Sequence, residues 1–290
     1  MAISPAHKFG QDLGNLLEII VLEKILKPRL EKIANANKFY LDSQIERPVR
    51  KGKKISWADQ YGNHHDLDFV IEKGGTPEKL GTPVAFIETA WRRYTKHSKN
   101  KAQEIQGAIL PIVARHQLSA PFCGVVLAGE FSEPSLVQLK NNNFYVLHIL
   151  YKNVIEAFLS IGFDISFNEK TSDDKYILAI KRFLELSDDE KDVISNALIK
   201  LSCLEIKEFM DALQNSLERN IIKILLIPLF GTEIRYASID SALNGMKNID
   251  SLQGYGKLQK IEIVVDYSNG DSIRASFTTA KTASLFLRGL

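Results

Sequence analysis

Two acidic side chains occupy corresponding ends of neighbouring strand-like runs. Asp68 lies where the run 67–71 begins, and Glu88 directly follows the run 84–87. In an antiparallel hairpin, the start of one strand lies beside the end of the next, so the two carboxylates can converge. Carboxylate oxygens suit Mg²⁺, which one or two of them can hold beside a phosphate. The spacing therefore predicts a shared Mg²⁺ site, in which we expect Mn²⁺ to substitute.

The chemistry expected of such a site is hydrolysis of a phosphodiester. A divalent cation promotes ionisation of water near pH 7 and stabilises charge on phosphoryl oxygens. A basic and aromatic segment follows Glu88 and is suited to hold a polyanion. We expect nucleic-acid contacts from this segment and from an earlier basic group, although such groups are often only solvated surface. The expected contact residues are Arg92, Arg93 and Lys101, and Lys51, Lys53 and Lys54, the last three next to Arg47 and Arg50.

Composition restricts the class of protein. The net charge is only +2, so a nucleic-acid surface must arise from local clustering. Cys123 and Cys203 lie far apart in apolar settings, which predicts buried thiols and a reducing compartment. The most apolar run, 221–230, is interrupted by a lysine and a proline and is too short to span a bilayer. Because the first residues do not resemble a secretory signal peptide, we expect a cytoplasmic protein that does not bind membranes.

The hydrophobic pattern over the first 170 residues predicts an α/β core. Apolar positions recur at helical spacing over 11–35, with a bend or break near Pro28. Three short runs rich in branched and aromatic residues follow, and we expect them to form one sheet. A helix and an unbroken apolar strand then indicate a crossover, which makes the sheet mixed. The expected strands are 54–57, 67–71, 84–87, 122–128 and 144–149, and the later helices are 99–116, 132–140 and 154–161.

The pattern changes beyond about residue 170. Ser187 and Glu190 form a capping-box signature, after which helical spacing continues with breaks to about Ile227. A hairpin is predicted over 261–277, with a closing helix over 282–290. No internal repeat is visible. We therefore expect a catalytic core at 1–170 and a mainly helical region at 171–290 that ends in a β-hairpin and serves dimerisation, DNA recognition or both.

These motifs together resemble the PD-(D/E)xK nuclease superfamily, which includes many type II restriction endonucleases and DNA repair nucleases. The resemblance covers roughly residues 10–150 and rests on the order of helix, three strands, helix and strand, with short motifs. Asp68 resembles the motif aspartate and Glu88 the motif acid. Glu18, in Gly14-Asn-Leu-Leu-Glu18, resembles a first-helix glutamate that supplements metal binding, although an exposed helix residue is an equal alternative. The resemblance implies a restriction-endonuclease-like core and Mg²⁺-dependent cleavage.

The chain departs from that family at one position. The family's lysine falls two residues after the motif acid, where this chain has Ala90. The resemblance allows a lysine from the following helix to replace it, so Lys96, Lys99 and Lys101 are candidates. We favour Lys99, because it opens the predicted helix, with Lys96 next. Gln103 resembles a polar helix residue that lines such sites.

Several neighbouring residues have simpler interpretations. Asp66 is either a third ligand or a solvent-facing residue, and Trp91 is expected to pack in the interior. His64 and His65 lack the soft ligands that would favour a transition-metal site, and a general-base role for His97 is likewise the less favoured interpretation. The resulting hypothesis is a type II restriction endonuclease that cuts double-stranded DNA as a homodimer. The alternatives are a structure-specific or repair nuclease and a non-catalytic nucleic-acid-binding protein.

Overall fold

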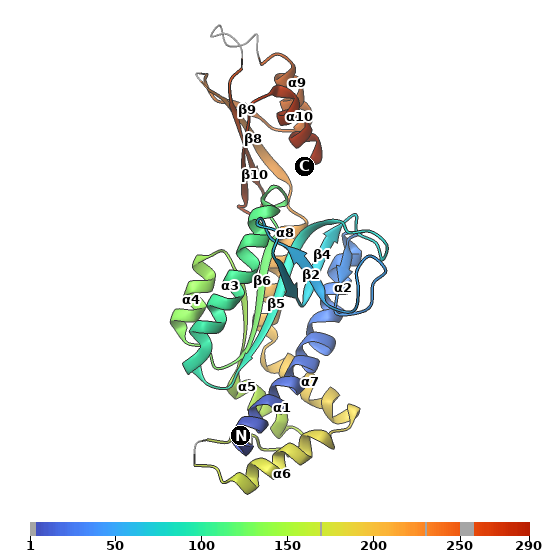
Figure 1. Ribbon diagram of the computed structural model, residues 1–290, viewed down its shortest axis with the longest axis vertical. Coiled ribbons are helices and arrows are strands. Elements are labelled where there is room, and N and C mark those ends of the chain that lie inside the picture. Colours follow the sequence, from blue (N-terminus) through green and yellow to red (C-terminus); the bar gives the residue numbers. More distant parts are fainter. Residues whose placement is uncertain (1–3, 169, 230, 250–257) are drawn as a thin grey trace. The chain divides into compact units, whose positions relative to one another are not determined.

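The computed structural model describes residues 4–168, 170–229, 231–249 and 258–290 (Figure 1). The chain divides into two compact units, one of residues 1–114 and 122–214 and the other of residues 115–121 and 215–290. We expected a division near residue 170. The segment 171–214 instead belongs to the first unit, because its helices pack on that unit's first helix and fifth helix.

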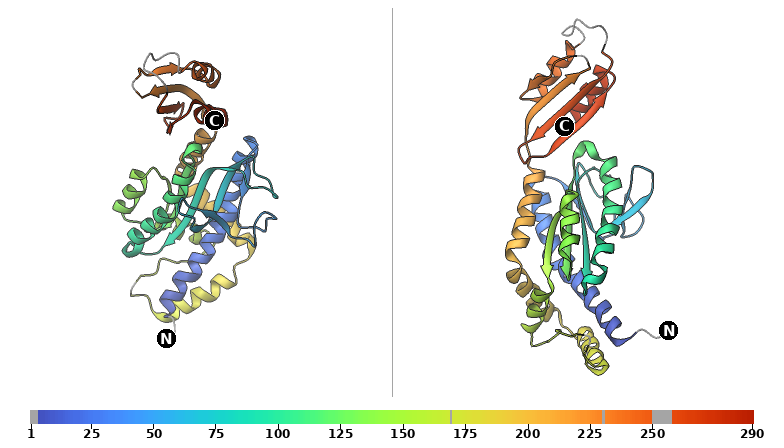
Figure 2. Two further views of the ribbon diagram at one scale, coloured as in Figure 1. Left: turned by 45° about the horizontal axis from the view of Figure 1, so that its top comes forward. Right: turned by 90° about the vertical axis from the view of Figure 1, so that its left-hand side faces the viewer.

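A five-stranded mixed sheet forms the centre of the first unit, in the order β1-β4-β5-β6-β7. β4 is antiparallel to β1 and β5, whereas β5, β6 and β7 run parallel. Helices cover both of its faces, as Figures 1 and 2 show, so the expected α/β class with a mixed central sheet is confirmed. The strands are β1 (Tyr40–Asp42), β4 (Phe69–Lys73), β5 (Thr82–Arg92), β6 (Phe122–Gly129) and β7 (Tyr145–Leu150).

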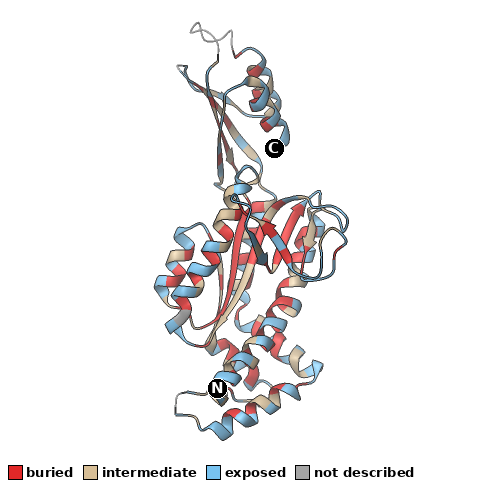
Figure 3. Cartoon of the chain, viewed as in Figure 1, coloured by how far each residue is buried: buried red, intermediate tan, exposed pale blue. Residues whose placement is uncertain are grey.

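The core lies against β6, the strand in which every residue is buried (Figure 3). A strand with parallel neighbours and helices on both faces reads as a continuous apolar run, as this one does. Val125 and Leu127 pack with α3 (Ser98–Arg115) and α4 (Glu133–Asn141) on one face. On the opposite face, a Cβ placed on Gly124 would lie 2.7 Å from the Phe209 ring of α8 (Cys203–Leu217).

The run that contains Asp68 is divided between two sheets. β2 (Ile55–Ala58) pairs with β3 (His64–Leu67) in a separate two-stranded sheet. The chain bends at Asp68 and enters the central sheet at Phe69 as β4. The expectation that 54–57 lies in the same sheet as the next two strands is therefore wrong. β1, which the sequence did not predict, is the neighbour of β4.

The first helical stretch changes geometry where a break was expected. α1 (Pro5–Ile19) begins with Ser4 as N-cap, and α2 (Lys27–Ala36) carries Pro28 in its first turn. The intervening segment η1 (Ile20–Leu26) is π-helical. Since proline lacks an N–H and its ring crowds the preceding turn, an altered hydrogen-bond pattern before Pro28 is physically reasonable.

The remaining helices of the first unit are α5 (Tyr151–Leu159), α6 (Asp173–Leu184), α7 (Asp188–Leu201) and most of α8. The predicted capping box is confirmed, because Ser187 and Glu190 accept each other's backbone N–H groups. α6 packs on α1 through an aromatic cluster in which Phe9 stacks with Phe183 and also meets Phe167 and Tyr176. This cluster holds the start of α1 in place.

The second unit is an antiparallel sheet with two helices. Its strands have the order β11-β10-β8-β9, so the expectation of helix up to about Ile227 is wrong. The apolar run there fits a buried strand and a helix equally well by periodicity. The predicted hairpin of β10 and β11 is confirmed. The elements are β8 (Ile221–Pro228), β9 (Ile234–Tyr236), α9 (Ile239–Lys247), β10 (Ile261–Tyr267), β11 (Ser272–Phe277) and α10 (Ala280–Gly289).

This unit consists of two strand-strand-helix halves, a repeat that the sequence did not reveal. The first strands of the halves, β8 and β10, pair at the centre of the sheet. Ser238 and Thr279 are the N-caps of the two helices, and each accepts from the backbone N–H three residues later. The halves share this architecture with few identical residues, which explains why no repeat was visible.

Two further sequence expectations concern cysteines and membranes. Cys123 and Cys203 are both free thiols, but Cys203 is exposed, so the expectation that both are buried is half right. Across the described ranges, no helix has the length and apolar character needed to cross a bilayer.

Candidate functional site

Asp68 and Glu88 lie at the same end of the β4–β5 hairpin, Asp68 directly before β4 and Glu88 within β5. Phe69, which follows Asp68, pairs with Ile87, which precedes Glu88, and the negative charge of Asp68 acts on the Glu88 carboxyl. The backbone N–H of Thr89 donates to Asp68 Oδ2 at 2.8 Å. The two carboxylates that the sequence picked out therefore share one end of the β4–β5 hairpin.

Asp68 is held by groups that the sequence gave no reason to select. The Thr89 hydroxyl also donates to Asp68 Oδ2, at 2.7 Å, and Gln44 Nε2 donates to Oδ1, at 2.7 Å. Burial raises the pKa of Asp68, while the Thr89 and Gln44 hydrogen bonds and the positive charge of Lys101 act against that rise. Thr89 could have been noticed as the neighbour of Glu88, but Gln44 comes from a loop without any motif.

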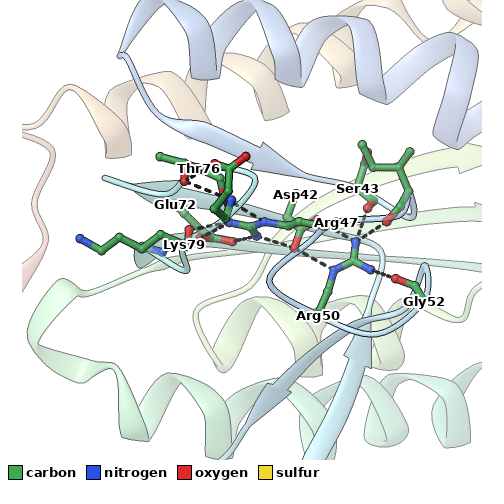
Figure 4. A network of polar contacts seen from close by, with 11 residues as sticks. Asp42, Ser43, Arg47, Arg50, Gly52, Glu72, Thr76 and Lys79 are labelled. Carbon is green, nitrogen blue, oxygen red and sulfur yellow. Dashed lines mark hydrogen bonds and ion pairs between the residues drawn. The ribbon is translucent and has the colours of Figure 1, made fainter.

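The loop that carries Gln44 is fixed by buried ion pairs (Figure 4). Arg47 Nη1 lies 2.8 Å from Asp42 Oδ2 and 2.6 Å from Glu72 Oε1, and its guanidinium is fully buried. Arg50 Nη2 lies 2.9 Å from Asp42 Oδ1. Arg47 therefore belongs to the interior, which corrects the view of the first basic group as one solvated or nucleic-acid-facing cluster. The same loop connects β1 to β2.

The rest of that group is exposed. Lys51 and Lys53 are solvent-facing, and Lys54 Nζ lies 2.7 Å from Asp66 Oδ2. Asp66 is thus a solvent-facing partner of a lysine, the simpler of its two sequence interpretations. His64 and His65 have polar partners too, since His65 Nε2 lies 3.0 Å from Asp59 Oδ2 and His64 Nδ1 lies 3.3 Å from Ser56 Oγ.

Glu88 has an incompletely satisfied carboxylate. Within the described part of the chain, its Oε2 atom is buried and has no hydrogen-bond partner. Burial and the negative charge of Asp68 raise the pKa of Glu88 from 4.5 to about 8, although Lys101 and a hydrogen bond from the Asp68 backbone act against the rise. A buried carboxylate with a free oxygen beside a second carboxylate is a site where a cation would be strongly stabilising.

Glu18 reaches the same place from α1. Burial and the charge of Asp68 raise the pKa of the Glu18 carboxyl. One turn earlier, a Cβ on Gly14 would lie 2.8 Å from Trp91 Cδ1, closer than packed atoms approach. A glycine therefore lets α1 touch the end of β5, and the spacing of four residues puts Glu18 on the same helix face as Gly14. The Gly-x-x-x-Glu spacing therefore has a steric explanation here, because the glycine allows the contact with β5 and the glutamate lies on the same helix face.

These groups open onto one cavity of about 770 Å³. One wall is a face of α1 and the start of η1, and the other is the end of β5, with Lys101 from α3 and two residues of β6. The charged and polar residues that line it are His7, Lys8, Gln11, Asn15, Glu18, Asp68, Glu88, Thr89, Arg92, Arg93, Tyr94 and Lys101.

Lys101, rather than the favoured Lys99, is the lysine of α3 that lines this cavity. Lys96, Lys99 and Gln103 are exposed and are not among its lining residues. Ser98 is buried and hydrogen-bonded with Ser132 and Ser135, which sets the rotation of α3 about its axis.

That rotation selects which lysine faces the acids. Lys101, three residues after Ser98, shares the inward face, while Lys99 turns about 100° away from Ser98. Lys101 Nζ also lies 3.6 Å from Glu104, a carboxylate that is 61% exposed.

The basic segment after Glu88 divides between packing and surface. Arg93 is buried, donates to the Phe167 carbonyl at 2.9 Å and to the Tyr176 hydroxyl at 3.2 Å, and stacks over Phe9. Its guanidinium therefore joins β5 to α6, which differs from the DNA contact expected of it. Arg92 is partly exposed and lies 4.0 Å from Glu104.

Trp91 is a packing residue, as the sequence indicated, but it is only partly buried and lines the cavity. Its ring meets Tyr151 edge-on at 5.6 Å between centroids. A Cβ on Gly129 would lie 2.6 Å from the same indole, and Gly129 has a φ of +100°. Both the close contact and the backbone conformation therefore require glycine at this position.

The donor set suits a hard cation. No group of three or more His, Cys, Asp or Glu among the described residues is arranged to enclose a metal ion. Mg²⁺ does not require such an enclosure, because it usually keeps several waters and takes one or two protein carboxylates. Asp68 and Glu88 provide two, and the unpaired Oε2 of Glu88 is the specific atom that lacks a partner.

Comparison with known proteins supplies no family. No protein-family model matches the chain, and none of the curated proteins matches it significantly. Among solved structures, one described as a protein of unknown function, AF1548, is similar over 72% of this chain and 98% of its own, with 8% sequence identity and a TM-score of 0.26.

Proposed function

We propose that the first unit is a divalent-cation-dependent nuclease in which Asp68 and Glu88 bind the cation. The observation that carries this proposal is that the two carboxylates, each next to a member of the Phe69–Ile87 pair, line one cavity that Lys101 also lines. Acid pairs with raised pKa values in a cavity are characteristic of functional sites. A purely structural ion-pair network would neutralise them, whereas Glu88 retains an unpaired oxygen.

The side chains divide the work as follows. The cation, when bound, supplies positive charge to the phosphoryl oxygens and promotes ionisation of water. Asp68 is oriented by Thr89 and Gln44, so its carboxylate needs no reorganisation on binding. Lys101 balances the acids and is the candidate for the role of the lysine replaced by Ala90. Glu18, on α1, is a further acidic residue that lines the same cavity.

The finer proposal is a type II restriction endonuclease with a restriction-endonuclease-like core. Its support is the order of α1, β4, β5, α3 and β6 around the acid pair, together with the motif resemblance. Mg²⁺ is the proposed cation, with Mn²⁺ as a substitute, and double-stranded DNA is the substrate. A two-fold dimer would present equivalent sites to both strands. We propose that the second unit serves dimerisation, DNA recognition or both.

Site-directed variants test the nuclease proposal. Asp68→Asn and Glu88→Gln keep the size of each side chain and remove its charge, so Mg²⁺-dependent cleavage of unmethylated phage DNA should disappear. The matched control is Glu31→Gln, since Glu31 is exposed on α2 and does not line the cavity. Cleavage that persists in both site variants would remove the assignment.

Substrate form separates the remaining alternatives. Discrete fragments from an intact plasmid favour the restriction enzyme, and preference for branched DNA favours a repair nuclease. DNA binding without cleavage at high protein concentration, in Mg²⁺ and in Mn²⁺, would identify a non-catalytic binding protein. Ala90 is the residue that favours this last possibility, and the position of Lys101 on the cavity weighs against it.

A further inference from the structure

The cavity continues well beyond the acid centre, along one face of α1. His7, Gln11, Asn15 and Glu18 line it and are all exposed. Their spacing of three or four residues places them in a row on one side of the helix. From His7 to Glu18, a rise of 1.5 Å per residue gives the row a length of roughly 16 Å.

The row changes in chemical character along its length. The Glu18 end faces Asp68 and Glu88, whereas the middle carries the neutral amides of Gln11 and Asn15. Among the described residues, neither amide side chain has a hydrogen-bond partner, so both can donate to a ligand. Arg92, on the opposite wall, adds positive charge.

The two walls touch at the floor of this cavity. Gly14, between Gln11 and Asn15 on α1, meets the Trp91 ring of β5, and no larger residue would fit between them. We call the part of the cavity along this row the trough. It is bounded by α1 and β5, which are in direct contact there. With a volume of about 770 Å³, the cavity has the size of a small-molecule pocket, which leaves room for one extended chain and none for a double helix.

We propose that this trough binds a single strand of nucleic acid that continues from the phosphate at the acid centre. Gln11 and Asn15 hydrogen-bond its phosphate or sugar oxygens, a role that amide side chains commonly serve. At roughly 3.4 Å per nucleotide, a 16 Å row spans about five nucleotides of a stacked strand. The inference rests on the proposed nuclease function and specifies its substrate at the site as one strand that has separated from its complement.

Binding measured in chelator, so that no cleavage occurs, tests the trough directly. The variant is Gln11→Leu combined with Asn15→Leu, which keeps similar volumes and a good helix former but removes the donors. The matched control is Asn35→Leu, an exposed position of α2 that does not line the cavity. The probes are a fluorescent single-stranded oligonucleotide and the same sequence as a hairpin duplex, with anisotropy as the readout.

We expect the double variant to bind the single strand about tenfold more weakly than the wild type, with little change for the closed duplex. Asn35→Leu should match the wild type on both probes. Unchanged single-strand affinity in the double variant would overturn the inference, and so would an equal loss on both probes.

Cleavage assays separate this inference from the nuclease proposal. If the wild type cuts DNA through Asp68 and Glu88 but the double variant binds normally, only the trough assignment fails. If the wild type and Asn35→Leu bind the strand, the double variant does not, and no divalent cation supports cleavage, the trough stands as a binding site and the nuclease proposal fails.

Discussion

Gln44 donates a 2.7 Å hydrogen bond to Asp68, and it is delivered there by a loop that the buried Arg47 ion pairs fix in place. This relationship joins a structural network to the acid pair. It makes Gln44 a positioning residue, because it acts through Asp68 and does not itself line the cavity.

Gln44→Leu is expected to weaken cation binding and cleavage by about tenfold without unfolding the protein. Loss of the donor removes a hydrogen bond that lowers the pKa of Asp68, so the acidic limb of the pH–rate profile should move to higher pH. Calorimetric titration with Mn²⁺ and a pH–rate profile measure the two effects. Gln60→Leu, at an exposed loop position, is the control. An unchanged profile would show that Gln44 has no such role.

Gly14→Ala is expected to destabilise the first unit by about 1–3 kcal/mol, since the added methyl would overlap the Trp91 ring. Separation of α1 from β5 should also displace Glu18 and reduce cleavage. Gly107→Ala is the matched control, because nothing lies within 4 Å of a Cβ at that position in α3. The control should be neutral or stabilising by up to about 1 kcal/mol, as alanine favours helix. Denaturant unfolding distinguishes the two, and equal stability would refute the contact.

The pH dependence of stability should report on Glu88. Its pKa is raised from 4.5 to about 8 in the folded protein, so the native state holds a proton that the unfolded state has released. That contribution to stability is full below pH 4.5 and is lost as pH rises through about 8. Without divalent cations, the melting temperature should therefore fall across this window, and Glu88→Gln should flatten the fall.

Added Mg²⁺ should act in the opposite direction. The cation binds the ionised carboxylate, so its stabilising effect on the wild type should grow as pH rises toward 8. Scanning calorimetry at several pH values, with and without Mg²⁺, measures both the fall of the melting temperature with pH and the increase of the Mg²⁺ effect with pH. A cation effect that does not vary with pH would place the ion elsewhere.

Lys101→Met is expected to lower the rate of cleavage by at least a hundredfold, because it removes a lysine charge that acts on both Asp68 and Glu88. The same change raises the pKa of both acids, so residual activity should shift to higher pH. Lys99→Met, two residues away and exposed, is the matched control and should retain near-normal activity. A larger loss from Lys99→Met than from Lys101→Met would restore the original choice.

Local patterns were sufficient for much of the fold. The apolar run of β6, the capping box at Ser187 and the turn between β10 and β11 are recorded in a few consecutive residues, and each was confirmed. Short-range signals of this kind depend on backbone chemistry and on burial, which the sequence displays directly. β8 was misassigned, because an apolar run of its length satisfies both helix and strand patterns.

The sequence by itself identified Asp68 and Glu88 as a candidate acid pair, since they lie at the ends of two runs that form a recognisable hairpin. Only the tertiary structure decided which groups surround it. The position of Gln44 depends on a loop fixed by buried charges, and that of Lys101 on the rotation of α3 set by Ser98. The position of Arg93 depends on aromatic packing against α6. These are contacts between distant segments, and their geometry is settled by packing in three dimensions, which no local pattern of residues encodes.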